Sequence, residues 1–114
     1  MQEKFDRQKH KRYKIAAKNI GMKYFSVDVT GQGYPYNGFS IAYVPAVKSV
    51  NCRMINVSVS YCAEEDKFKA KRGKFQALHK QFETGEIVTL PLAEFYKDFG
   101  DKDLQAVLTS MFLV

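Results

Sequence analysis

The sequence predicts an α+β domain in which a basic N-terminal helix precedes an antiparallel sheet of about four strands. Three observations support this fold class. Apolar and polar residues alternate strictly from Ile55 to Tyr61, which is typical of a strand. Apolar residues at helical spacing follow between residues 67 and 83. Three further apolar runs are bounded by glycine or proline, as strands are. We expect a basic helix or arm over residues 1–21 and a single domain over 22–114.

The first element is a predicted helix over residues 3–20, with Gly21 as its C-cap. Its apolar side is thin and is interrupted by Lys9 and Arg12, so the helix is expected to fray or to become ordered on a partner. The other side is basic; it is either a solvated surface or a contact for an anionic partner. The apolar side is expected to hold Phe5, Tyr13, Ala16 and Ile20, and the basic side Lys4, Arg7, His10, Lys11, Lys14 and Lys18.

Three apolar runs predict the first, second and fourth strands. The loop after the first run contains two glycines but lacks the following Lys and Ser/Thr of a phosphate-binding loop. We therefore interpret it as an irregular connection whose tip exposes Tyr34 and Tyr36. The second run is halted by Pro45, and the fourth strand ends at Pro91. The three runs are Met22–Val29, Phe39–Val44 and Glu86–Leu90.

The third strand and the helix after it form the centre of the predicted fold. The strand is expected to bury one face and to expose the other to water. The acids at 64–66 stand where the helix over 67–83 would begin, which suits the positive end of its dipole. Lys71 falls within the apolar arc of this helix, so either its stem extends past the apolar residues or its charge meets a partner there. Gly73 costs the helix about 1 kcal/mol relative to alanine. Close packing of the helix on the sheet is favoured as the reason for this glycine, over the approach of a phosphate. The strand is expected to bury Ile55, Val57, Val59 and Tyr61 and to expose Asn56, Ser58 and Ser60, and the helix arc holds Phe68, Phe75, Leu78 and Phe82.

Two short helices are expected to close the chain. The first covers Leu92–Phe99. The second starts at Leu104, with Asp101 or Asp103 as its N-cap. The apolar residues 112–114 either dock in the core or, if exposed, promote self-association into a homo-oligomer.

Composition excludes two broad classes of protein. Hydrophobic residues make up 46% of the chain, which is too many for a wholly disordered protein. No apolar run approaches the ~18 residues that span a bilayer, and the charged N-terminus lacks the apolar core of a secretory signal. Cys52 and Cys62 lie at opposite ends of the predicted third strand, about 30 Å apart. We therefore expect two reduced thiols and a cytoplasmic location, with no association with membranes.

Charge is distributed unevenly along the chain. The formal net charge is +6, and residues 1–23 carry all of this excess, with eight Lys/Arg against two acids. Residues 24–114 are neutral overall, but six cations and no acid lie in 67–80. Two basic segments of this kind favour a partner that is itself anionic.

No catalytic, metal or nucleotide motif is present in the sequence. The two cysteines and two histidines are scattered, without the spacing of a zinc site. Cys62 precedes the predicted helix, a place that can lower a thiol pKa, but three neighbouring acids oppose thiolate formation. We therefore expect neither an enzyme nor a cofactor.

One stretch resembles a pattern in small accessory proteins of tailed bacteriophages. There, a strand ending in cysteine leads to D-x-F-x-x-K-x-G, a helix and another strand; the resemblance is confined to residues 52–92. It implies a phage origin and a small protein of the host cytoplasm that acts on nucleic acid or on a host factor. The family implies no single activity. The matching residues are Tyr61, Cys62, Asp66, Lys67, Phe68, Lys71, Arg72, Gly73, Ala77, Glu83, Thr84, Gly85 and the strand EIVTLPL.

The leading functional hypothesis is a non-enzymatic protein that binds nucleic-acid phosphates through the basic arm and the basic helix. Tyrosines beside lysine and arginine can stack on the bases of single strands. The alternative is an inhibitor or adaptor that binds an acidic host protein, such as a host enzyme or a defence complex. The predicted binding residues are Lys9, Lys11, Arg12, Lys14, Lys18, Lys67, Lys71, Arg72, Lys74, Tyr34 and Tyr36.

Overall fold

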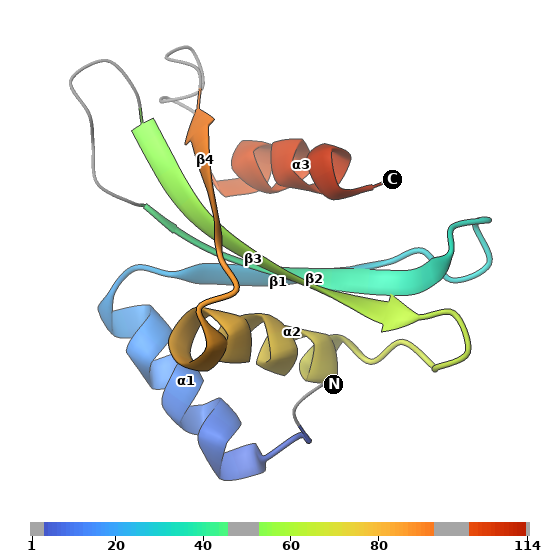
Figure 1. The fold of residues 1–114 in the computed structure, drawn as a ribbon, viewed down its shortest axis with the longest axis horizontal. Coiled ribbons are helices and arrows are strands. Elements are labelled where there is room, and N and C mark those ends of the chain that lie inside the picture. Colours follow the sequence, from blue (N-terminus) through green and yellow to red (C-terminus); the bar gives the residue numbers. More distant parts are fainter. Residues whose placement is uncertain (1–3, 46–52, 93–100, 114) are drawn as a thin grey trace.

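A computed structural model describes residues 4–45, 53–92 and 101–113 and shows a four-stranded antiparallel sheet between layers of helices (Figure 1). The strands follow chain order, β1-β2-β3-β4. Helices α1 and α2 cover one face of the sheet, and α3 lies on the other (Figure 1). The predicted α+β class and antiparallel sheet are therefore confirmed. The elements are α1 Arg7–Asn19, β1 Lys23–Asp28, β2 Tyr36–Pro45, β3 Arg53–Ala63, α2 Ala70–His79, the π-helical turn η1 Lys80–Thr84, β4 Val88–Leu92 and α3 Asp101–Phe112.

The sheet face under α3 holds the larger apolar core. Ile41 lies opposite Val59, and Phe39 lies opposite Tyr61, so these side chains are cross-strand neighbours on one face of the sheet. The predicted buried face of the third strand is confirmed for Ile55 and Val57, both about 1% exposed, whereas Val59 is half-buried and Tyr61, at 36%, is exposed. The fully or nearly fully buried members of this core are Val29, Tyr36, Phe39, Ile41, Tyr43, Ile55, Val57, Leu104 and Leu108.

The sheet face under α2 is built from small side chains, and the prediction that it is wet is wrong. Ser40, Ser58 and Ser60 are buried there. The Ser58 hydroxyl donates to the carbonyl of Ala77 in α2 at 2.7 Å, so a polar side chain is buried with its hydrogen bond made. These small residues let the helix approach closely, and a Cβ on Gly73 would clash with Ser40 Oγ. The expectation that Gly73 packs on the sheet is borne out by this contact.

Helix α2 starts later than the sequence predicts. Its N-cap is Lys69, and the acids at 64–66 form an exposed turn after β3 rather than the first turn of the helix. Phe68 consequently precedes the helix, where its ring lies against Gly38 of β2. Lys71 is exposed rather than within a buried arc. Phe75 and Leu78 are fully buried, as predicted.

Helix α1 is shorter than predicted, and its buried side is rotated. Asp6 caps it, and His10, predicted to be part of the basic side, is only 4% exposed. Ile20 was expected to be buried but is 54% exposed. The buried side contains Tyr13, whose ring stacks on Phe75 of α2 with ring centroids 5.7 Å apart. The ring packing, rather than the thin aliphatic stripe, fixes how α1 sits.

Several predicted boundaries near the C-terminus also change. Leu92 belongs to β4, which passes through Pro91 instead of ending there; residues 93–99 of the predicted first short helix lie outside the described residues. The final helix α3 begins at Asp101 and buries Leu104 and Leu108. Phe112 and Leu113 pack against the core partly buried, which supports docking of the tail. The ends of the other strands differ from the predicted ends by one to three residues.

Candidate nucleic-acid interface

One side of α1 presents a row of lysines to solvent. The N-terminus of the helix is capped by Asp6, whose carboxylate accepts hydrogen bonds from the backbone N–H groups of Gln8 at 3.0 Å and Lys9 at 3.1 Å. Residues three and seven apart share a side of a helix that turns once every 3.6 residues. The row next to the buried side therefore holds Lys11, Lys14 and Lys18, all exposed.

Lys23 joins this row because the chain reverses directly after α1. Gly21 has φ of 72°, a left-handed conformation that glycine adopts without a steric penalty. The Met22 N–H then donates to the carbonyl of Ala17 at 2.8 Å, so β1 starts beside the last turn of the helix. The result is a groove of about 520 Å³, which we call the lysine groove. Its lining includes Lys11, Lys14, Ile15, Lys18, Lys23 and Tyr24.

The lysine groove combines cations with apolar surface. Four ammonium groups line it, and no carboxylate is among its lining residues in the described part of the chain. Ile15 is 55% exposed at its edge, and Tyr24 is half-buried in its wall. Ammonium groups attract phosphates, while tyrosine and isoleucine give bases and sugars a surface to pack on. This combination of ammonium groups with apolar and aromatic surface is chemically suited to a nucleic-acid strand.

Lysines from the second basic segment meet α1 around His10. Burial is the main reason that the pKa of His10 is lowered, and the charges of Lys14, Lys71 and Lys74 lower it further. The imidazole of His10 itself packs against Phe75 of α2, and the three lysines lie within electrostatic range of it. The Lys71 ammonium also lies 5.7 Å from the centre of the Phe5 ring. We call this cluster the lysine seam; Lys14 belongs to both the seam and the groove.

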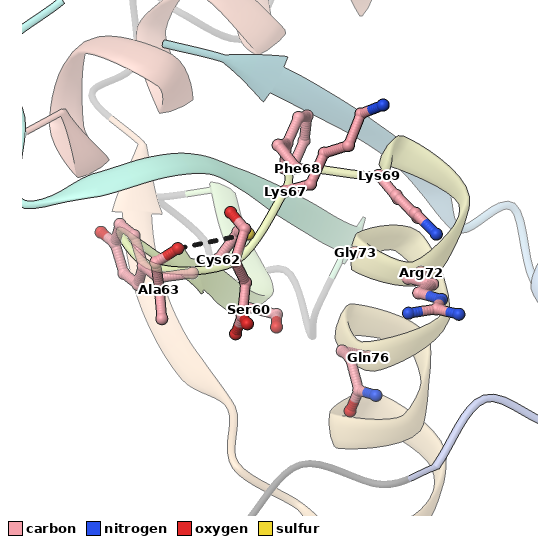
Figure 2. Close-up of a pocket in the computed structure, with 11 residues that line it drawn as sticks. Ser60, Cys62, Ala63, Lys67, Phe68, Lys69, Arg72, Gly73 and Gln76 are labelled. Atoms are coloured by element: carbon pink, nitrogen blue, oxygen red, sulfur yellow. Dashed lines mark hydrogen bonds between the residues drawn. The ribbon is translucent and has the colours of Figure 1, made fainter. Parts of the chain in front are cut away.

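Two predicted cations of the second segment lie at a separate place. Lys67 and Arg72 line a pocket of about 310 Å³ between the end of β3 and the start of α2, called here the α2 pocket (Figure 2). No residue lines both this pocket and the lysine groove. Cys62 also lines the α2 pocket, where burial raises the pKa of its thiol; the charges of Asp66, Asp28 and Glu65 raise it further. Thiolate formation is therefore disfavoured there.

The two tyrosines predicted at an exposed loop tip do not form such a tip. Tyr36 is 7% exposed and packs against Tyr61, with ring centroids 4.8 Å apart. Tyr34 is half-buried and stacks on Tyr36. The prediction failed because Tyr36 is the first residue of β2 and faces the core under α3. Of the remaining predicted residues, Lys9 and Arg12 line neither the groove nor the pocket.

Sequence reasoning missed Lys23, Tyr24 and Gln105 as parts of one site. The signal for Lys23 was the predicted C-cap at Gly21, which places the next residues beside the helix end. Gln105 reaches the groove from α3, where its side-chain amide donates to the Tyr43 hydroxyl at 3.3 Å. Only the folded arrangement brings that residue to the groove.

A polar network fixes α1, and with it the lysine row, on the rest of the domain. The Tyr13 hydroxyl donates to Glu83 Oε1 at 2.8 Å and lies 3.0 Å from His79 Nδ1. A hydroxyl has one hydrogen, so His79 must carry its proton on Nδ1 and donate it to Tyr13. Glu83 lies in the π-helical turn η1, which continues α2. The network therefore joins α1 to both segments of the second helix.

The described residues contain no group of three or more His, Cys, Asp and Glu side chains able to hold a metal ion. Among the same residues, no helix is long and apolar enough to span a membrane. The fold is that of a small α+β domain, and four lysines line one groove on its surface. No protein-family model matches the chain, and no curated protein or solved structure gives a match either.

Proposed function

We propose that this protein binds nucleic acid without a catalytic role, by laying a sugar–phosphate backbone along the lysine groove. The observation that supports the proposal is the convergence of Lys11, Lys14, Lys18 and Lys23 on one concave surface. Like charges held together are unfavourable unless an anion or solvent compensates them, and a chain of phosphates does so at regular intervals.

The side chains that line the groove favour a single strand over a duplex. Tyr24 and Ile15 lie among the lysines, so unpaired bases can pack on them while the phosphates meet the ammonium groups. The phosphates of a duplex surround its stacked bases and would leave these two side chains unused. The lysine seam extends the cationic surface past Lys14 toward Lys71 and Lys74. The proposed setting, a phage-encoded protein acting in the host cytoplasm, rests on the sequence resemblance alone.

Fluorescence anisotropy with a labelled oligonucleotide tests this proposal. The variant Lys14→Glu/Lys18→Glu reverses two charges of the groove, and we expect it to weaken binding to a single-stranded oligonucleotide by at least about tenfold. Both side chains are exposed, so the fold should persist, which circular dichroism checks.

A charge-matched pair provides the control. Lys67→Glu/Lys69→Glu changes the net charge by the same amount at the α2 pocket, and we expect it to weaken binding much less. Equal losses in the two variants would mean that only net charge matters and would remove the groove from the proposal. Wild-type protein that binds an acidic host protein but no oligonucleotide would favour the inhibitor or adaptor hypothesis instead.

A further inference from the structure

The α2 pocket lies on the face of the sheet under α2, between the end of β3 and the start of the helix (Figure 2). Its volume of about 310 Å³ is at the lower end of the range for sites that take small molecules. Strand and helix both line it, with Ser60 and Cys62 on one side and Arg72 and Gln76 on the other (Figure 2). No lining residue is shared with the lysine groove, so the nucleic-acid contact proposed above leaves this pocket unused.

The Ser60 hydroxyl is a polar group in this pocket that the described protein leaves without a partner. Ser60 is only 4% exposed, and it stands two residues from Ser58 in β3, so both side chains point to the α2 face. The hydroxyls of Ser58 and Ser40 on that face both make hydrogen bonds. The Ser60 hydroxyl makes none with any described residue. Because a buried hydroxyl is unfavourable without a hydrogen bond, an oxygen atom of a ligand in the pocket would gain a donor here.

Cations outnumber carboxylates in the lining of the pocket. Asp66 is the one carboxylate there, against Lys67, Lys69 and Arg72. The side chains of these three cations make no ion pair or hydrogen bond with any described residue. Lys69 and Arg72 are three residues apart and lie next to each other at the start of α2 (Figure 2). Like charges at this spacing repel, and an anion held between them removes the repulsion.

The start of α2 adds partial positive charge at the same place. Lys69 is the N-cap of this ten-residue helix, and its side chain makes no capping hydrogen bond. No acidic residue lies in the first turn either. The first N–H groups of a helix have no acceptor within it, and they attract anions. The helix end and the three cations therefore favour the same kind of ligand.

The ligand that fits these groups is a dianion with an apolar part. Three positive charges and one negative charge give the lining residues a net charge of +2. A phosphate monoester carries about −1.5 to −2 at pH 7. The half-buried ring of Phe68 lines the pocket and offers a surface for an organic group. We propose that the α2 pocket binds a phosphate monoester, whose oxygens accept hydrogen bonds from Ser60, Lys69 and Arg72.

Titration of the isotope-labelled full chain with phenyl phosphate, followed by amide chemical shifts, tests the proposal. Phenyl phosphate combines the dianion with a ring that can pack on Phe68, and phenol is the control that lacks the phosphate. We expect saturable shifts at residues 60–63 and 67–73 with phenyl phosphate and none with phenol. No saturable shifts with phenyl phosphate, equal shifts with phenol, or shifts located only at the lysine groove would overturn the proposal.

Two double variants with equal loss of charge test the cations. Lys69→Gln/Arg72→Gln removes two cations of the pocket and should weaken binding of phenyl phosphate by at least about tenfold. Arg12→Gln/Lys102→Gln removes two exposed cations outside the pocket and should leave that binding unchanged. Equal losses in the two variants would mean that only net charge matters, and they would overturn the assignment of the site.

The variant Ser60→Ala tests the hydroxyl. Since this hydroxyl has no partner among the described residues, its removal should leave the fold intact, which thermal unfolding checks. Binding of phenyl phosphate should weaken by about tenfold, because a hydrogen bond to a charged group is lost. Unchanged binding by a folded Ser60→Ala protein would contradict the proposed position of the phosphate.

A phosphate monoester occurs both in small metabolites and at the 5′ end of a nucleic-acid strand. A short oligonucleotide with and without a 5′-phosphate distinguishes these sources. Shifts at the pocket that require the 5′-phosphate would assign the end of a strand as the ligand. Shifts with phenyl phosphate but with neither oligonucleotide would assign a small metabolite. The test of the lysine groove uses an oligonucleotide without a terminal phosphate, so failure of one proposal leaves the other standing.

Discussion

Replacing Gly73 by alanine tests how closely α2 lies on the sheet. Helix propensity alone predicts that Gly73→Ala stabilises the protein by about 1 kcal/mol. The structure predicts the opposite, because a Cβ at this position would clash with Ser40 Oγ and lie 3.1 Å from Ser40 Cβ. Ser40 is fully buried, and its hydroxyl shares a 2.6 Å hydrogen bond with Ser26.

The magnitude follows from these two contacts. Overpacking a buried contact costs about 1–3 kcal/mol. Rotating Ser40 away from the new methyl group would break its bond to Ser26, which adds about 0.5–1.5 kcal/mol. After subtraction of the gain in helix propensity, Gly73→Ala should lower the free energy of unfolding by about 1–3 kcal/mol.

Urea denaturation of four proteins forms the assay. They are the wild type, Gly73→Ala, Ser40→Ala and the double variant. Ser40→Ala removes the clashing oxygen, so Gly73→Ala should cost much less in that background, and the difference measures the contact directly. A stabilised Gly73→Ala protein, or equal effects in both backgrounds, would refute the close packing of α2 on β2.

Two further predictions concern stability. Phe75 is fully buried between α1, α2 and the sheet, so Phe75→Ala should cost about 3–5 kcal/mol in urea denaturation; a loss under about 1 kcal/mol would place α2 outside the core. The pKa of His10 is lowered in the folded protein by burial and by Lys14, Lys71 and Lys74, so the unfolded chain binds a proton at His10 more readily. The contribution of neutral His10 to stability is therefore complete above its unfolded pKa of about 6.5 and is lost as the pH falls below that value, by at most about 1.4 kcal/mol per pH unit. His10→Phe should show a smaller loss of stability than the wild type between about pH 7.5 and pH 5.5; equal losses would contradict this role of His10.

The sequence was informative where a side chain's neighbours are local. Alternation along β3 identified Ile55 and Val57 as core residues, and helical spacing identified Phe75 and Leu78. The groove was partly predictable in the same way, because Lys11, Lys14 and Lys18 share a side of any helix through them.

Predictions failed where contacts between distant segments override local patterns. Ser58 looked solvent-facing, but it is buried because α2 supplies an acceptor for its hydroxyl. His10 looked like part of a basic surface, yet it is buried against the rings of Phe5, which precedes α1, and Phe75 of α2. The charges of Lys14, Lys71 and Lys74 all act on His10 because of how the two helices pack, which no spacing in the sequence encodes.

The salt dependence of oligonucleotide binding tests the central claim most directly. If the four lysines of the groove contact phosphates of a single strand, the logarithm of the binding constant should fall with the logarithm of salt concentration with a slope of about −3. Lys14→Glu/Lys18→Glu should reduce the slope to about half, and Lys102→Glu should leave it unchanged. A wild-type slope near zero, or no binding at low ionic strength, would contradict the account of the lysine groove as a nucleic-acid interface.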